Sequence, residues 1–211
     1  MILRILLIAP SIAGIDAVPE LRTIASVHHV MPLTGEVSAQ DIYHQTREHN
    51  YHVLHFATHS HDDQVKLSGD EIFKPADVAR ASSLAQANLV FFNSCRSGLL
   101  ASYAVRHGLA YSIYTNSDLP DAQAWKMPLS FYENLSAHSE IDYVTAFLHA
   151  DVGDGIYGLV VAPQLLKDLP PISYTPEFDD VERLRRLLKK RPVKSKREYK
   201  HGNPGDSDSL L

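Results

Sequence analysis

Short apolar runs alternate with longer polar segments along most of this chain. Continuous apolar runs of six to eight residues, bounded by turn-forming residues, are typical of strands buried on both faces of a parallel sheet. We therefore expect six strands, at residues 2–9, 27–33, 52–57, 88–93, 109–114 and 156–161.

Between these runs, apolar residues recur at helical spacing. Leu21 and Ile24 predict a helix over residues 18–27, and Ser38 followed by Asp41 resembles a capping box at the start of another. Strands that alternate with helices in this way predict an α/β fold, a layered sandwich on a mainly parallel six-stranded sheet. Further helices are expected at residues 75–82, 99–107, 122–135 and 142–149, and a small hairpin within residues 65–74.

The alternation of strands and helices ends near residue 162. Residues 163–176 hold four prolines, which predict a linker, and Thr175-Pro176-Glu177 signals the start of a further helix. That helix carries one narrow apolar stripe among many basic residues. We expect one domain at 1–162 and, at 163–211, a linker, a basic amphipathic helix and a disordered tail.

Charge is distributed unevenly between these two parts. Residues 1–182 have a net charge of −12 and residues 183–211 a net charge of +7, which together give the total of −5. A basic tail of this kind can bind the acidic body, an acidic partner or nucleic acid. No apolar run reaches the roughly 20 residues of a membrane helix, so no membrane partner is expected. The single cysteine excludes an intrachain disulfide framework, and a free thiol suits the cytoplasm.

Two of the predicted strands lead into residues that could form a thiol–imidazole pair. The run at 52–57 leads to His59, and the run at 88–93 leads into a polar turn that holds Cys95. Reactive groups of parallel sheets lie in the loops after the carboxyl ends of the strands. A cysteine attacks as its thiolate, with a neighbouring imidazole as base. The alternative is a structural cysteine beside an ordinary loop histidine.

A metal site is a competing interpretation of the same region. His59, His61 and Asp63 have a His-x-His-x-Asp spacing similar to that of metallo-β-lactamase-type hydrolases. Gln64 stands where that motif has a further histidine, so we favour the thiol interpretation and a solvated loop position for His61.

Three further polar residues have both a structural and a functional interpretation. His55 lies in the middle of an apolar strand, which favours a hydrogen-bonded core histidine. Asp118 and Asp121 follow the fifth predicted strand, on the same rim as His59 and Cys95. Taken alone they suit a turn and the first turn of a helix. Together they could form an acidic pocket for a basic side chain.

Six motifs follow one another in a fixed order over residues 1 to about 162. This order resembles that of the CHAT family of caspase-like cysteine peptidases, which are related more distantly to separases. The motifs are Ala57-Thr-His-Ser60, Leu67-Ser-Gly-Asp70, Asn93-Ser-Cys-Arg-Ser-Gly98, Gly108-Leu-Ala110, Asp121 and Phe131-Tyr-Glu-Asn-Leu135.

The resemblance implies a caspase-like fold in which His59 is the general base and Cys95 the nucleophile. Backbone N–H groups of Ser60 and Cys95 would form the oxyanion hole, and no metal or other cofactor is implied. By likeness to separases, Asp121 with Asp118 would bind an arginine or lysine at P1, the substrate residue before the cleaved bond.

We therefore predict a caspase-like cysteine endopeptidase that cleaves a protein substrate after a basic residue. Family members usually carry sensor modules, so a separate sensor or activator protein is expected, in bacterial defence or regulated cell death. Ser60 stands where the family favours glycine and Ser117 where it often has tryptophan. These departures motivate a second hypothesis, a catalytically silent caspase-like signalling module. A metallohydrolase that uses His59, His61 and Asp63 is the third.

Overall fold

The computed structural model describes residues 2–12, 14–61, 64–119, 124–137, 142–150 and 156–167. All of them belong to the first of the two units into which the chain divides, Met1–Ile172 and Ser173–Leu211. The expected basic helix and tail therefore lie outside the described residues, as does all of the linker after its first five positions.

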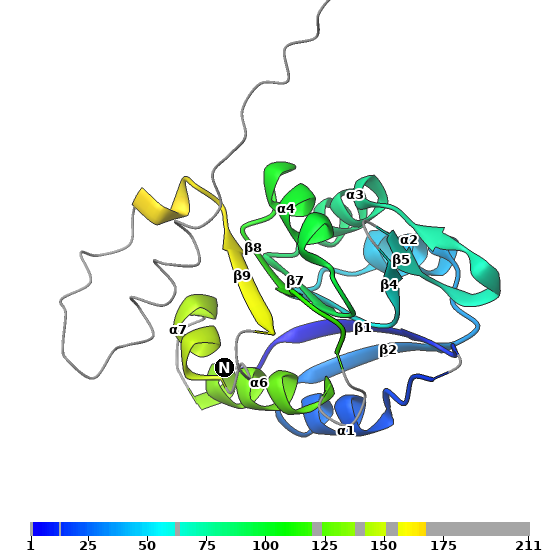
Figure 1. Ribbon diagram of the computed structural model, residues 1–211, viewed down its shortest axis with the longest axis horizontal. Coiled ribbons are helices and arrows are strands. Elements are labelled where there is room, and N and C mark those ends of the chain that lie inside the picture. Colours follow the sequence, from blue (N-terminus) through cyan, green and yellow to red (C-terminus); the bar gives the residue numbers. More distant parts are fainter. Residues whose placement is uncertain are drawn as a thin grey trace, which may run out of the picture. The chain divides into compact units, whose positions relative to one another are not determined.

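Six strands form the central sheet, as the sequence predicts, in the order β2-β1-β3-β7-β8-β9 (Figure 1). The first five run parallel to one another, and β9 pairs with β8 in the antiparallel direction. The bounds are β1 Arg4–Pro10, β2 His29–Gly35, β3 Val53–Ala57, β7 Leu89–Asn93, β8 Tyr111–Thr115 and β9 Tyr157–Val161.

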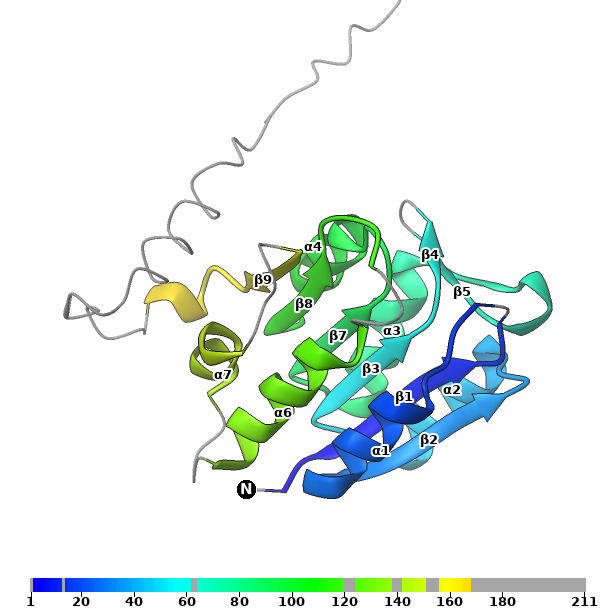
Figure 2. The same cartoon turned by 60° about the horizontal axis from the view of Figure 1, so that its bottom comes forward.

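Helices cover both faces of this sheet (Figure 2). On one face α1 packs against α6 and α6 against α7, and on the other α3 packs against both α2 and α4. None of the helices in the described part of the chain is long and apolar enough to cross a membrane. The helices are α1 Val18–Val27, α2 Ala39–Glu48, α3 Pro75–Ala85, α4 Gly98–Arg106, α6 Lys126–Ala137, α7 Tyr143–His149 and the short 3₁₀ turn η2 Leu165–Lys167.

The region after β3 forms a second, three-stranded antiparallel sheet of β4 (Ser60–His61), β5 (Gln64–Lys66) and β6 (Ile72–Phe73). The predicted hairpin is confirmed as the β5–β6 pair, joined through the 3₁₀ turn η1 (Ser68–Asp70). Strand β4 was not predicted, since two polar residues carry no strand signal of their own. It matters because β4 begins directly after His59.

Alternating side chains of the central strands enter two separate cores. Leu54, Phe56, Val90 and Phe92 pack with apolar residues of α2, α3 and α4. On the opposite face, Phe91 meets aromatic rings of α6 and β9. Both sets are fully buried, which explains why these strands are apolar throughout rather than at every second position.

Two caps show how local sequence sets the helix ends. The predicted capping box is confirmed at α2, where Ser38 Oγ accepts from Asp41 N–H and the Asp41 carboxylate accepts from Ser38 N–H. Helix α3, predicted to end at Ser82, continues to Ala85. The Ser82 hydroxyl donates to Val78 C=O at 2.8 Å inside the helix. The helix instead ends at Gln86, which adopts a left-handed φ of 54°.

His28 makes the stability of this fold sensitive to acid. Its Nδ1 accepts from Leu3 N–H at 3.3 Å, and its Nε2 donates to Tyr132 C=O at 3.1 Å. This arrangement requires a neutral ring, and burial lowers the pKa of His28. Burial, followed by the charge of Arg4, also lowers the pKa of His52. A histidine with a depressed folded-state pKa stabilises the fold above its unfolded value of about 6.5, and this contribution is lost as the pH falls.

The free energy of unfolding should therefore fall between pH 7.5 and pH 5.5, as measured by urea denaturation. We expect His28→Gln to remove part of that pH dependence, because glutamine can accept and donate but does not titrate. His107→Gln, at an exposed position after α4, is the matched control. An unchanged slope in His28→Gln would contradict this prediction.

Candidate active site

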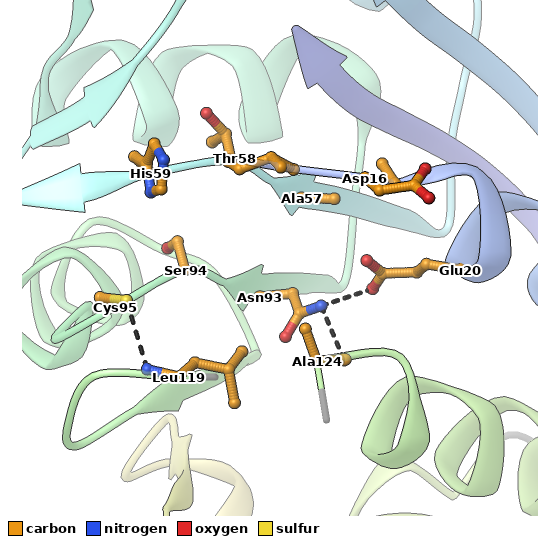
Figure 3. A pocket seen from close by; sticks show the side chains of 12 residues that line it. Asp16, Glu20, Ala57, Thr58, His59, Asn93, Ser94, Cys95, Leu119 and Ala124 are labelled. Carbon is orange, nitrogen blue, oxygen red and sulfur yellow. Dashed lines mark hydrogen bonds between the residues drawn. The ribbon is translucent and has the colours of Figure 1, made fainter. Parts of the chain in front are cut away.

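Strands β3 and β7 bring His59 and Cys95 to the same edge of the sheet. The two strands are parallel neighbours, and their last residues, Ala57 and Asn93, are paired. His59 and Cys95 each lie two residues after these paired positions. His59 and Cys95 both line one pocket of about 60 Å³ (Figure 3). Two residues that lie 36 positions apart in the sequence therefore line the same pocket.

The turn that carries Cys95 is fixed to β8 by side-chain hydrogen bonds. Ser94 C=O accepts from the hydroxyl of Ser97 at 3.0 Å and from the hydroxyl of Thr115. Ser97 Oγ in turn accepts from Thr115 N–H at 3.1 Å. These bonds hold the backbone on both sides of Cys95. Helix α4 begins at Gly98, so the positive end of its dipole lies close to the cysteine.

The loop after β8 covers the sulfur of Cys95. Leu119 N–H donates to Cys95 Sγ at 3.3 Å, and Leu119 also lines the pocket. A cysteine sulfur can accept a hydrogen bond, so this N–H group helps to fix the position of Sγ. Arg96, with a left-handed φ of 50°, donates from its backbone N–H to Ser117 C=O at 3.3 Å. Half-buried Cys95 thus lies under a loop that is bonded to it directly.

Ser60 joins β4 to the cysteine turn. Lys66 N–H donates to His59 C=O at 2.9 Å, which makes Ser60 and Val65 a non-hydrogen-bonded pair of the antiparallel ladder. The N–H of Ser60 therefore faces away from β5. Its hydroxyl donates to Cys95 C=O, so the side chain that replaces the expected glycine fastens the histidine segment to the cysteine segment.

The β1–α1 connection forms the wall of the pocket opposite Leu119. Gly14 adopts a φ of +88°, a conformation that favours glycine, and a Cβ placed there would lie 3.8 Å from His59 Nε2. The chain then continues through Asp16, which lines the pocket and whose Oδ1 accepts from Val18 N–H at 3.0 Å. Figure 3 shows Asp16 and Glu20 at the end of the pocket away from Cys95.

A buried polar cluster forms the floor. Glu20 Oε1 accepts from His55 Nε2 at 2.6 Å and from Asn93 Nδ2 at 2.8 Å. The Tyr132 hydroxyl bonds His55 Nδ1 at 2.9 Å, and the Tyr157 hydroxyl donates to Asn93 Oδ1 at 2.7 Å. Burial, and after it the charge of Glu20, raises the pKa of both tyrosines, so both hydroxyl groups stay protonated.

His55 is the core histidine that the sequence predicts. It is fully buried and stacks on Phe91 with ring centroids 4.6 Å apart. Its partner Glu20 was missed as a pocket residue. A signal was present, because Glu20 lies four positions before Ile24 and therefore on the buried face of α1. A carboxylate and an imidazole at two buried positions are expected to pair.

Of the remaining predicted site residues, the structure describes only the side chain of Asp118. Asp118 does not line the pocket: its carboxylate, 72% exposed, binds Arg96 Nη2 at 2.9 Å. Asp121 and Asp63 lie outside the described residues, as does the side chain of His61. Within the described part of the chain, no group of three or more His, Cys, Asp or Glu side chains could hold a metal ion.

No protein-family model and no curated protein sequence matches this chain. A thiol, an imidazole and a buried carboxylate share one pocket at the carboxyl edge of a mostly parallel sheet. The first two suit nucleophilic acyl transfer.

Proposed function

We propose that this protein is a caspase-like cysteine endopeptidase, with Cys95 as nucleophile and His59 as general base. The observation that carries the proposal is the shared pocket, where adjacent parallel strands deliver both residues. The order of motifs similar to that of the CHAT family supports it. So does a sheet of five parallel strands closed by antiparallel β9.

The proposed reaction is peptide hydrolysis through an acyl-enzyme. Cys95 Sγ attacks the carbonyl carbon of the scissile bond after His59 takes the thiol proton, and His59 then protonates the departing amine. Water hydrolyses the thioester in the second half of the reaction and restores the thiol. The backbone N–H groups of Ser60 and Cys95 would stabilise the oxyanion, and the outward direction of the Ser60 N–H agrees with this role.

The substrate class and the setting follow from the resemblance and stay proposals. They are a protein substrate cleaved after arginine or lysine, a separate sensor or activator protein, and a cytoplasmic role in bacterial defence or regulated cell death. The described carboxylates that line the pocket are Asp16 and Glu20.

The loop at 116–119 supports the need for an activator. The pocket volume of about 60 Å³ is well below the roughly 300 Å³ of the smallest usual ligand pockets. The bond from Leu119 N–H to Cys95 Sγ holds the loop against the cysteine. Entry of a long basic side chain therefore requires the loop to move outward, and a bound partner could stabilise that open arrangement.

A panel of fluorogenic peptides that differ only at P1 tests the proposal. We expect cleavage after arginine or lysine, and none by Cys95→Ala, because the thioester cannot form. Activity that persists in Cys95→Ala would refute the proposed mechanism. The full chain should be assayed with and without candidate partner proteins.

The second candidate function is a catalytically silent caspase-like signalling module. The observation that favours it is the bond from the Ser60 hydroxyl to Cys95 C=O, which fills the place where the family favours glycine. Under this alternative Cys95 does not react with peptide electrophiles in the presence of any partner. Covalent capture of Cys95 by an arginyl chloromethyl ketone, located by mass spectrometry, would exclude it.

A further inference from the structure

The pocket beside Cys95 and His59 is acidic. Of its lining residues, Asp16 lies exposed at the rim and Glu20 lies in the floor with 4% of its surface exposed. No lysine or arginine lines this pocket within the described part of the chain. Arg96, next to Cys95 in the sequence, binds the exposed carboxylate of Asp118 and does not line the pocket.

Glu20 lies at the inner end of this pocket with two donors on one of its oxygens. Its Oε1 accepts from His55 Nε2 at 2.6 Å and from Asn93 Nδ2 at 2.8 Å. No lysine or arginine among the described residues lines the pocket beside it. A carboxylate in this position can pair with a cation that enters the pocket.

Ser94 provides an independent sign that a ligand belongs in this pocket. Its side chain lines the pocket, the residue is 2% exposed, and its Oγ has no hydrogen-bond partner among the described residues. Figure 3 shows this side chain projecting toward His59. A buried hydroxyl without a partner is costly, so a bound polar group that pairs with it would recover that cost.

We propose that Glu20, assisted by Asp16 at the rim, binds the cationic side chain of the substrate's P1 residue. The inference rests on the proposed peptidase function and names the residues of that site which select the substrate. It assigns recognition to the β1–α1 side of the pocket rather than to Asp118 and Asp121 after β8. A lysine or arginine that reaches past Cys95 meets first Asp16 and then Glu20.

Glu20→Gln is the decisive variant, because it removes the charge and keeps the shape. The glutamine carbonyl can accept both from His55 Nε2 and from Asn93 Nδ2, so the floor retains its hydrogen bonds. Asp16→Asn is the second variant, at an exposed position where the amide oxygen can still accept from Val18 N–H. Glu133→Gln, at an exposed position on α6, is the matched control.

The measurement is the ratio of kcat/KM for a peptide with P1 arginine to that for the same peptide with P1 leucine. We expect Glu20→Gln to lower this ratio by at least ~30-fold, as for loss of one partner of a buried charge pair. Asp16→Asn should lower it by a few-fold, and Glu133→Gln should leave it unchanged. Labelling of Cys95 by iodoacetamide should proceed at the same rate in all variants, which verifies that the fold and the thiol are intact.

Two outcomes would overturn the inference while the peptidase function stands. One is a preference for arginine that survives in both Glu20→Gln and Asp16→Asn. The other is a preference lost in Asp118→Asn but not in Glu20→Gln. Failure of the peptidase function itself has a different signature, because Cys95 would then react with iodoacetamide but with no peptide probe.

Discussion

Replacing His59 by alanine should lower kcat/KM for a basic-P1 peptide by about 10²–10⁴-fold. Among the described side chains that line the pocket, the imidazole of His59 is the one suited to take the thiol proton and return it to the leaving amine at neutral pH. Without it, the pocket lacks the group proposed to take the thiol proton and to protonate the departing amine.

The control and a second readout separate catalysis from folding. His107→Ala removes an exposed imidazole that stacks on Tyr103, with ring centroids 3.9 Å apart, and should leave kcat/KM unchanged. Alkylation of Cys95 by iodoacetamide at pH 6.5 should slow in His59→Ala and stay unchanged in His107→Ala. Equal alkylation rates in wild type and His59→Ala would show that the two side chains are not coupled.

Phe91→Ala should lower the free energy of unfolding by about 3–5 kcal/mol. The ring is fully buried in β7 and lies in the middle of an aromatic cluster. It stacks on His55 at 4.6 Å and meets Phe131 at 5.6 Å and Tyr157 at 6.2 Å, measured between ring centroids. Truncation removes these contacts and leaves a cavity in the middle of the cluster.

Denaturant unfolding followed by far-UV circular dichroism measures this loss, with the slope of the transition compared between variants. Leu99→Ala, at a position 62% exposed on α4, is the matched control and should change stability by less than ~0.5 kcal/mol. A loss below ~1 kcal/mol for Phe91→Ala would mean that the aromatic cluster repacks around the space.

The hydrophobic pattern predicted β1, β3 and β7 because these strands are buried along almost their whole length. Edge strand β2 has no buried residue and begins at His29, two positions later than predicted. The helix at 18–27 was predicted with its observed bounds, since the spacing of Leu21 and Ile24 is a local signal. The turn after β3 was only partly predictable. Strand β4 exists because the chain turns back to pair Ser60 with Val65, a contact that no local pattern encodes.

The residues of the candidate site also differ in how far local sequence predicts them. His59 and Cys95 were predictable because each follows a strand, and parallel neighbours end at the same edge. The carboxylates were not: the spacing from Glu20 to Ile24 places Glu20 on the buried face of α1. Only the fold brings Glu20 and Asp16 to the pocket of Cys95. Asp118 stood at the expected rim, but Arg96 draws its carboxylate to the outside.

The bond from Tyr157 to Asn93 has a consequence for how the protein is made. Tyr157 belongs to the last strand of the sheet, whereas Asn93 precedes the cysteine by two residues. A nascent chain released from the ribosome before β9 emerges has the cysteine and histidine strands but lacks the hydroxyl that orients Asn93. The floor of the pocket is therefore complete only when almost the whole domain has been synthesised. A chain that stops before β9 contains His59 and Cys95 but lacks the Tyr157 bond to Asn93.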